Sequence, residues 1–224
     1  MIGYEAPRDP ADAERIQASL RDRLDLTDRL AVMPASVVGL DVSYEVGSPR
    51  VAAAAVVIDV ATLEVRESAI AHGEAAFPYV PGLLAFREVP ILLDALGMLA
   101  TRPEVLICDG YGIAHPRRFG LACHLGVLTG LPSFGVAKTA FTAGFLEPGQ
   151  QRGDWSPLVE GEEVLGRALR TQTGIKPVFV SVGHRVGLDQ ATELTLALSG
   201  RFRIPEATRK ADFFSREALR NTRT

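Results

Sequence analysis

The sequence predicts a single α/β domain, and three observations lead to this prediction. Apolar stretches that end at turn residues alternate with stretches in which apolar residues recur at helical spacing. The chain of 224 residues has the length of one moderate domain with a substantial core. No internal repeat, linker or low-complexity segment divides it. We therefore expect residues 1–224 to form one domain.

The composition argues against membrane and secreted proteins. A hydrophobic content of 47% with 23% charged residues is ordinary for a soluble globular protein. No segment is apolar for long enough to cross a bilayer, and the N-terminus lacks the basic and apolar blocks of a signal peptide. Cys108 and Cys123 lie in apolar stretches without metal-type spacing. We expect reduced thiols, a cytoplasmic location and no membrane partner.

The charge is distributed unevenly along the chain. Residues 1–112 carry 17 acids and 9 bases, whereas residues 113–224 carry 10 acids and 15 bases, so the halves have net charges of -8 and +5. Such asymmetry favours a nucleic-acid partner, although in a folded domain whose halves interleave it also arises by chance. Arginine greatly outnumbers lysine, which suits contact with phosphate.

The first part of the chain predicts one helix and a three-stranded meander. Asp9 as N-cap, Pro10 in the first turn and an apolar stripe predict a helix from about Pro10 to Leu26. Three successive strands with short turns suggest antiparallel pairing. They are expected at Val37–Tyr44, Arg50–Val60 and Glu64–His72. Asp41 interrupts the first of them, and a charge inside a buried strand is costly unless it is paired or metal-bound.

A stiff loop follows the meander. Pro78 and Pro81 flank Tyr79-Val80 and hold an extended segment with an aromatic side chain at its tip. Tyr79 is explained either as a core anchor under a proline turn or as a wedge inserted into a base stack. A helix is expected from about Gly82, with a break or kink at Pro90 near Glu88.

Val105–Asp109 is the stretch around which the other predictions are organised. Its continuous apolar run predicts a strand buried on both faces. The preceding helix allows this strand to lie parallel to the first one through a crossover connection. Asp109 then emerges at the edge where open α/β sheets hold ligands. Asp-Gly is also a common turn pair, so Asp109 alone is equally well explained as a turn cap.

Downstream, further helices and strands complete the predicted domain. The helices are expected at Phe119–Thr129, about Asp189–Leu198 and about Pro205–Leu219; the strands are expected at Ser133–Lys138 and Val178–Val182, with a hairpin of Trp155–Val159 and Val164–Thr171. Each of these elements supports the α/β class.

Five side chains of this plan suggest phosphodiester chemistry. Asp41 and Asp109 lie on neighbouring strands, and Glu88 supplies a third carboxylate. Carboxylates that would otherwise repel one another need a hard divalent cation such as Mg²⁺. Lys138 can neutralise charge on a phosphate, and His115 can orient or protonate it. Each residue alone has an ordinary structural explanation, such as a cap or an exposed lysine. His124 and His184 are expected to pack in the interior rather than to ligate a metal.

The sequence resembles the endonuclease V family, nucleases that act on deaminated bases, chiefly hypoxanthine. The motifs that carry the resemblance are residues 38–43, 77–88, 109–117, 135–138 and 203–209. The likeness covers roughly residues 10 to 220, with the motifs in order, and the long middle motifs are specific. The resemblance implies an RNase H-like α/β fold with a mixed five-stranded central sheet and helices on both faces.

The resemblance also implies site residues. Asp41, Glu88 and Asp109 match the metal-binding and catalytic acids of the family, and Lys138 and His115 match residues near the scissile phosphate. Asp212 stands where some relatives have a histidine; a hard oxygen donor there suits a fourth metal ligand but not a proton donor. The strand-separating wedge and the base pocket are matched by Tyr79 with Pro78, Val80 and Pro81, and by Gly82, Leu84, Gly110 and Leu121.

The implied activity is Mg²⁺-dependent, with Mn²⁺ expected to substitute. Family members nick DNA at the second phosphodiester 3′ of the deaminated base, leaving a 3′-hydroxyl and a 5′-phosphate and initiating repair. The expected partner is DNA containing deoxyinosine or another deaminated base, with inosine-containing RNA as the alternative. Removing the damaged base from the stack is easiest where pairing is already weakened.

Three alternatives remain open at this point. An ATP-using enzyme of the actin and sugar-kinase type would need a glycine-rich phosphate hairpin after Asp41, which is absent. A protein that binds deaminated nucleic acid without cutting it would have no use for the three acids. A junction or RNA nuclease would use the same acids, since they serve any phosphodiester.

Overall fold

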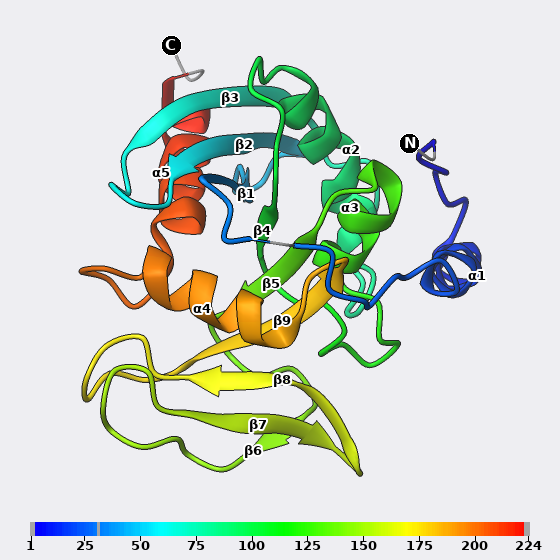
Figure 1. The fold of residues 1–224 in the computed structure, drawn as a ribbon. Coiled ribbons are helices and arrows are strands. Elements are labelled where there is room, and N and C mark those ends of the chain that lie inside the picture. The colour runs from blue at the N-terminus through cyan, green and yellow to red at the C-terminus, as the bar shows by residue number, and fades with distance from the viewer. Residues whose placement is uncertain (1–2, 31, 222–224) are drawn as a thin grey trace.

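A nine-stranded mixed sheet forms the centre of the protein (Figure 1). The computed structural model describes residues 3–30 and 32–221. The strands are β1 (Ser36–Tyr44), β2 (Arg50–Asp59), β3 (Val65–Glu74), β4 (Leu106–Asp109), β5 (Ser133–Ala137), β6 (Gly144–Phe145), β7 (Trp155–Glu160), β8 (Glu163–Leu169) and β9 (Val178–His184). The helices are α1 (Pro10–Arg21), α2 (Leu84–Gly97), α3 (Leu121–Thr129), α4 (Leu188–Leu198) and α5 (Glu206–Asn221). The strand order is β3-β2-β1-β4-β5-β9-β8-β7-β6.

The predicted pairings of the first strands are confirmed. β1, β2 and β3 form an antiparallel meander. β4 lies parallel to β1, and β5 lies parallel to β4. The carboxyl ends of β1, β4 and β5 therefore share one edge of the sheet, where Asp41, Asp109 and Lys138 occur in sequence.

The predicted number of five strands is wrong. β3-β2-β1-β4-β5 make up only part of the sheet, because β9 pairs antiparallel with β5 and the hairpin β7–β8 extends the sheet beyond β9. The sequence predicts the β7–β8 hairpin, which is confirmed, and the strand β9, but not their addition to the edge of the sheet, which tertiary packing decides. The two-residue strand β6 was not predicted, since so short a strand carries no periodic pattern.

Helices cover both faces of the sheet, as predicted. α1, α2 and α3 contribute to one hydrophobic core with Val38, Leu40 and Cys108 on the strands. α4 and α5 contribute to a second core on the other face, with Val37 and Ile107. Alternate residues of β1 thus point into different cores, as the period of two in a strand requires. No helix of the described residues has the length and apolar character to cross a membrane.

The first helix ends earlier than predicted. α1 stops at Arg21 rather than near Leu26, with Asp22 as its C-cap. The next residues turn toward the end of β9, where the Asp25 N–H donates to His184 Nδ1 at 3.2 Å. The Arg185 N–H donates to the Asp25 carbonyl at 2.7 Å. The apolar residues keep their helical spacing as far as Leu24, but these long-range hydrogen bonds hold the chain after Arg21 in a non-helical conformation.

Pro90 does not break α2, which runs without interruption from Leu84 to Gly97. Proline has no N–H, so the carbonyl four residues earlier, that of Phe86, loses its helical partner. The hydroxyl of Tyr4 donates to this carbonyl at 3.2 Å. Burial raises the pKa of Tyr4 to about 12, so the hydroxyl keeps its proton. The N-terminal segment thereby stabilises the helix that carries Glu88.

We expect Tyr4→Phe to lower the free energy of unfolding by about 1 kcal/mol, because the Phe86 carbonyl then lacks a partner. Urea unfolding followed by circular dichroism measures the change. Tyr79→Phe is the matched control, since it removes a hydroxyl from a side chain that is 70% exposed. Equal stabilities of the two variants would show that the Tyr4 hydroxyl does not support α2.

α5 packs directly on the backbone of β1. A Cβ at Gly39 would approach the Ala207 carbonyl oxygen to 2.1 Å, so only glycine permits this contact. Ala207 lies at the start of α5, and Ser215 lies two turns further along its buried face. The close approach fixes the helix relative to the strand that carries Asp41.

Candidate active site

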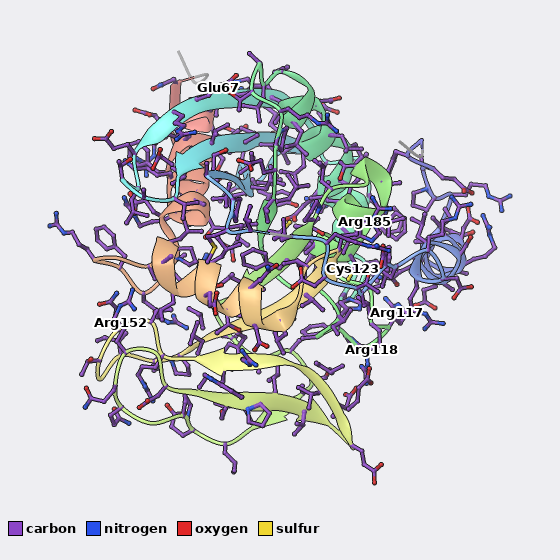
Figure 2. The ribbon with its side chains drawn as sticks, viewed as in Figure 1. Glu67, Arg117, Arg118, Cys123, Arg152 and Arg185 are labelled. Atoms are coloured by element: carbon purple, nitrogen blue, oxygen red, sulfur yellow. The ribbon has the colours of Figure 1, made fainter. Side chains whose placement is uncertain are left out.

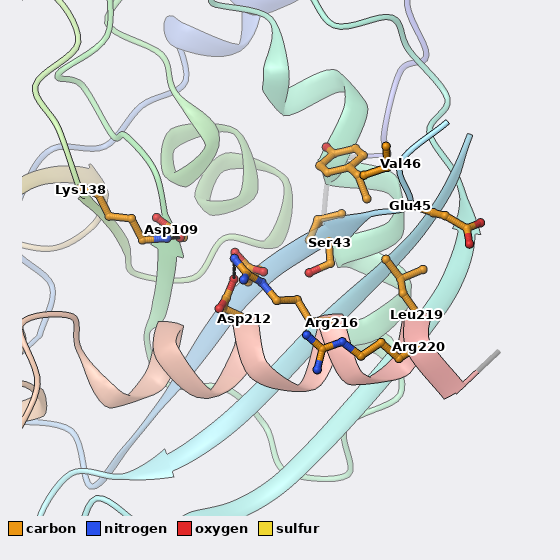
Figure 3. A pocket seen from close by; sticks show the side chains of 12 residues that line it. Ser43, Glu45, Val46, Asp109, Lys138, Asp212, Arg216, Leu219 and Arg220 are labelled. Carbon is orange, nitrogen blue, oxygen red and sulfur yellow. Dashed lines mark hydrogen bonds and ion pairs between the residues drawn. The ribbon is translucent and has the colours of Figure 1, made fainter. Parts of the chain in front are cut away.

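An acidic pocket lies at the carboxyl edge of β1, β4 and β5 (Figure 3). It has a volume of about 610 Å³, and one end is lined by Asp41, Asp109, Lys138 and Asp212. In the parallel ladder, Leu40 pairs with Cys108, so the aspartates that follow them emerge side by side. Asp212 comes from α5. We call this cavity the acid pocket.

The acid pocket concentrates negative charge around Asp41. Burial and the charges of Asp109 and Asp212 raise the pKa of Asp41 to about 7. The Ser215 hydroxyl donates to Asp41 Oδ2 at 3.0 Å and acts in the opposite direction. Asp41 is therefore only partly ionised at neutral pH unless a cation compensates for its neighbours.

Lys138 is placed against one of these acids. Its Nζ lies 2.5 Å from Asp109 Oδ2. Burial works to lower the pKa of Lys138, but its hydrogen bond and charge pairing with Asp109 outweigh this and raise it. Lys138 is thus cationic at neutral pH, and its half-exposed side chain borders the acid pocket.

Glu88, the predicted third carboxylate, lies behind the wall of the acid pocket, hydrogen-bonded to the pocket-lining residue Tyr44. It is 7% exposed, does not line the acid pocket, and accepts a 2.9 Å hydrogen bond from the Tyr44 hydroxyl. Burial, aided by the charges of Asp41 and Asp109, raises the pKa of Glu88 to about 8. Within residues 3–30 and 32–221, no three Asp, Glu, His or Cys side chains are assembled into a metal site. The structure thus couples Glu88 to the two aspartates electrostatically, and its role as a metal ligand stays a prediction.

A second cavity, which we call the apolar pocket, adjoins the acid pocket. Its volume is about 230 Å³. Of the predicted base-pocket and wedge residues, it is lined by Tyr79, Pro81, Gly82, Leu84, Gly110 and Leu121. Pro78 and Val80 do not line it: Pro78 is exposed, and Val80 packs against the core. Asp109 lines both pockets.

Sequence reasoning missed the aromatic side of the apolar pocket. Phe141, which is 41% exposed, lines it together with Tyr111 and Phe119. The Phe141 ring stacks on His115 with a centroid separation of 5.7 Å and lies 5.2 Å from the Tyr111 ring. Phe141 stands in a loop three residues after Lys138, outside any motif, so only its exposed aromatic character signals a role.

The comparisons with known proteins decide the family. A family profile described as Endonuclease V matches residues 18–213. Proteins named endonuclease V from Streptomyces avermitilis and Nocardia farcinica are 56% and 54% identical to this chain. In both cases the match covers 96% of this chain and 94% of the relative. The chain belongs to the endonuclease V family. It is therefore a nuclease, a hydrolase of phosphodiesters.

Solved endonuclease V structures share the fold. The crystal structure of the Streptomyces avermitilis protein has a TM-score of 0.94 at 53% identity, covering 100% of this chain and 98% of that one. The catalytic domain of human endonuclease V has a TM-score of 0.89 at 40% identity, with 95% and 96% covered. Ciona intestinalis endonuclease V, solved with a 24mer DNA containing an inosine, has a TM-score of 0.83 at 28% identity, with 95% and 98% covered. The predicted RNase H-like α/β class is confirmed, apart from its strand count.

His115 lies in the apolar pocket of this endonuclease V chain rather than in the acid pocket. Burial, reinforced by the neighbouring charge of Arg117, lowers the pKa of His115 to about 4. The imidazole is therefore neutral at pH 7 and suited to hydrogen bonding rather than to carrying a charge. Its ring is held between the backbone near Gly82 and the stacked ring of Phe141.

Two arginines hold the loops of the apolar pocket in place (Figure 2). Arg117 Nη2 donates to the Gly82 carbonyl at 2.8 Å, and Gln17 of α1 donates to the Phe119 carbonyl at 2.7 Å. Arg118 adopts a left-handed backbone (φ 54°) and pairs with Glu160 and Glu163 at the tip of the β7–β8 hairpin. The pocket loops are thus tied to α1 on one side and to the hairpin on the other.

The remaining candidate histidines lie away from both pockets, as expected. His124 is fully buried against the rings of Phe86 and Phe119, and burial lowers its pKa to about 3. His184 Nδ1 accepts a hydrogen bond from the Asp25 N–H. Neither histidine lines the acid pocket.

The carboxylates of the acid pocket fit a divalent cation. Asp41, Asp109 and Asp212 present only hard oxygen donors, the type that Mg²⁺ and Mn²⁺ accept. In the described residues the three side chains are not drawn together into a metal site, but the charges of Asp109 and Asp212 both act to raise the pKa of Asp41. A cation there would remove this repulsion and allow Asp41 to ionise fully.

Proposed function

We propose that this chain is a Mg²⁺-dependent endonuclease that recognises hypoxanthine and other deaminated bases in DNA. It nicks the second phosphodiester 3′ of the deaminated base and so initiates repair. Mn²⁺ substitutes for Mg²⁺. The protein acts in the cytoplasm, where its two buried free cysteines remain reduced.

The observation that carries the proposal is the sharing of Asp109 by the two pockets. When a base is held in the apolar pocket, the DNA strand that carries this base passes the mouth of the acid pocket. The phosphodiester to be cut then lies beside the base that is read, so recognition and hydrolysis are coupled by position.

Asp41, Asp109 and Asp212 would hold the cation, and Glu88 would support the site through its charge. The bound cation supplies positive charge to the phosphodiester and an activated water. Lys138, held at Asp109, can transfer its charge to a phosphate oxygen as negative charge develops there.

The apolar pocket can distinguish hypoxanthine from adenine through backbone groups. Leu121 opens α3, where a first-turn N–H lacks a helical carbonyl partner, whereas the Gly120 N–H already donates to the Gly112 carbonyl at 3.0 Å. Hypoxanthine presents a carbonyl where adenine presents an amine. An N–H donor therefore favours hypoxanthine and leaves the adenine amine unpaired. Phe141 and Tyr111 supply aromatic surface for the base.

Tyr79 can fill the gap that the extracted base leaves. Its side chain stands at the rim of the apolar pocket and is 70% exposed. The prolines on either side limit the loop to extended conformations, so little conformational entropy is lost on insertion. An exposed aromatic on a stiff loop is the type of residue that separates stacked bases.

The test is a labelled duplex with one deoxyinosine, incubated with the protein and Mg²⁺. We expect one nick, at the second phosphodiester 3′ of the inosine, and none in EDTA or in a matched adenosine duplex. Product ends mapped on a sequencing gel give the position. Cutting of both duplexes alike would contradict base recognition, and no cutting of either would contradict the proposed substrate.

Inosine-containing RNA is the second candidate substrate. The Ciona intestinalis relative was solved with a strand in which the inosine is followed by a ribo-adenosine. The same assay with an inosine RNA strand decides between them: faster cutting of RNA than of DNA would make RNA the preferred substrate.

A further inference from the structure

We propose that Arg216 and Arg220 of α5 bind the backbone phosphates of the strand on the 3′ side of the cut. The inference rests on the proposed function, which supplies the direction of the strand. It assigns the end of the acid pocket opposite Lys138 to the downstream part of the DNA.

The acid pocket extends well beyond its three aspartates. Beyond Asp212 it continues along α5, past Arg216 to Arg220 (Figure 3). Residues four apart on a helix lie on the same face, so the two guanidinium groups follow one another along the pocket wall. The adjoining face of this helix is buried: Ala211 and Ser215 are fully covered, and Leu219, which borders the pocket, is 8% exposed. The arginines therefore face the cavity because packing fixes the helix rotation.

Arg216 is available to a phosphate. Its present partner is Asp212 at 2.8 Å, and the side chains of the pair are 61% and 32% exposed. Ion pairs this exposed contribute little stability, about 0–1 kcal/mol. A phosphate offers a guanidinium two parallel hydrogen bonds and a higher negative charge. Exchange of Asp212 for a phosphate would also leave the Asp212 carboxylate facing the metal end of the pocket.

The facing wall of the pocket does not repel a phosphate strongly. It consists of the end of β1 and the following turn, Tyr44 to Val46. Its one acid, Glu45, pairs with Arg50 at 3.6 Å. Val46 is 94% exposed and offers an apolar surface to a sugar. The channel therefore has a basic wall and a largely neutral one, which suits a single backbone.

The order of the sites gives the direction of the strand. The apolar pocket, Asp109, the carboxylates and the two arginines follow one another. If the recognised base lies in the apolar pocket and the cut is made at the carboxylates, the two arginines lie beyond the cut. Because the cut is 3′ of the base, the strand at α5 is the 3′ part, and its phosphates face Arg216 and Arg220.

The test combines charge removal on the protein with charge removal on the DNA. Neutral methylphosphonates replace the third and fourth linkages 3′ of the inosine, just beyond the cut. Single-turnover cleavage at increasing protein concentration gives the half-saturating concentration. For the unmodified protein we expect methylphosphonates to raise it about tenfold, as loss of two phosphate contacts implies. Arg216→Ala with Arg220→Ala should raise it similarly and remove the further effect of the methylphosphonates.

Salt dependence provides a second readout. The slope of log affinity against log salt should fall by about 2 in the double variant, roughly one per lost phosphate contact. The matched control is Arg66→Ala with Arg102→Ala, which removes the same charge. These residues stand next to the start of β3 and ahead of β4, at the opposite edge of the sheet. The control should retain the response to methylphosphonates.

The outcomes separate the two proposals. If the unmodified protein does not cut the unmodified inosine strand, the proposed function is overturned, and this inference with it. If it cuts but the double variant responds to 3′ methylphosphonates as strongly as the unmodified protein, only the assignment of the arginines is overturned. A selective loss of the response to methylphosphonates placed 5′ of the inosine would also overturn it, since the strand would then run the other way.

Discussion

Asp41→Asn is expected to lower the single-turnover cleavage rate about 10³-fold, because a metal-ligating carboxylate stabilises the transition state by several kcal/mol. The side chain keeps its size and its place beside Ser215. Binding of the inosine strand should persist within a few-fold, since the apolar pocket does not include Asp41. Cleavage assays and fluorescence anisotropy on the same labelled strand measure the two quantities.

The same variant should be more stable than the unmodified protein in the absence of metal. Burial and two neighbouring acids raise the pKa of Asp41, which means that its charge destabilises the folded state. Asparagine removes the charge. Loss of activity with a gain in stability would identify Asp41 as a residue retained for function at a cost in stability.

Glu45→Gln is the control for Asp41→Asn. Glu45 also lines the acid pocket, but at the end away from the other carboxylates. Its loss should change the cleavage rate by less than about threefold, because Arg50 already pairs with Glu45. Equal losses in the two variants would mean that general charge, rather than the carboxylate group at Asp41, governs cleavage.

The sequence predicts the positions of the site better than its details. Asp41 and Asp109 were placed together because parallel strands align their carboxyl ends, and the ladder shows them side by side. The burial of Glu88 behind Tyr44 was not predictable, because the rotation of α2 depends on packing and on the Tyr44 hydrogen bond. Phe141 was missed because no periodicity marks a loop residue.

The same distinction applies to the fold. Apolar residues that recur every two residues identified most strands, and those that recur every 3.6 residues identified most helices. These periods arise because each element buries one or both of its faces. The end of α1 was wrong because hydrogen bonds to His184 and Arg185, far along the chain, override the local pattern. The extension of the sheet by β9 also depends on contacts between distant segments. Local sequence thus predicts elements, and long-range contacts decide where they end and which edge they join.

The stability of the metal-free protein is expected to fall by about 2 kcal/mol between pH 6.5 and pH 8.5, because the effect of Asp41 and Glu88 exceeds the opposite effect of the buried histidines. Their folded-state pKa values, about 7 and about 8, lie above those of unfolded carboxyls. The folded state therefore holds protons that the unfolded state has already released. For such groups the stabilising contribution is complete below the unfolded pKa and is lost as the pH rises through the folded pKa.

The buried histidines set the lower limit of this window. The pKa values of His115 and His124 are lowered by burial, so below about pH 6.5 the unfolded state gains protons that the folded state refuses. As the pH rises, this effect of the histidines increases the free energy of unfolding. It would hide the decrease caused by the two carboxyls if the measurements began near pH 5. At pH 6.5 the unfolded histidines are about half protonated, and they lose these protons within about one pH unit, so the carboxyls dominate over most of the window.

Guanidinium unfolding in EDTA at several pH values across this window measures the effect. Asp41→Asn combined with Glu88→Gln should remove most of the slope, since neither side chain can then titrate. Saturating Mg²⁺ should stabilise the unmodified protein more at pH 8.5 than at pH 6.5, because the cation binds ionised carboxylates and competes with protons for them. A stability that rises with pH in the metal-free protein, or a Mg²⁺ effect independent of pH, would show that these acids are already charged and do not share one cation.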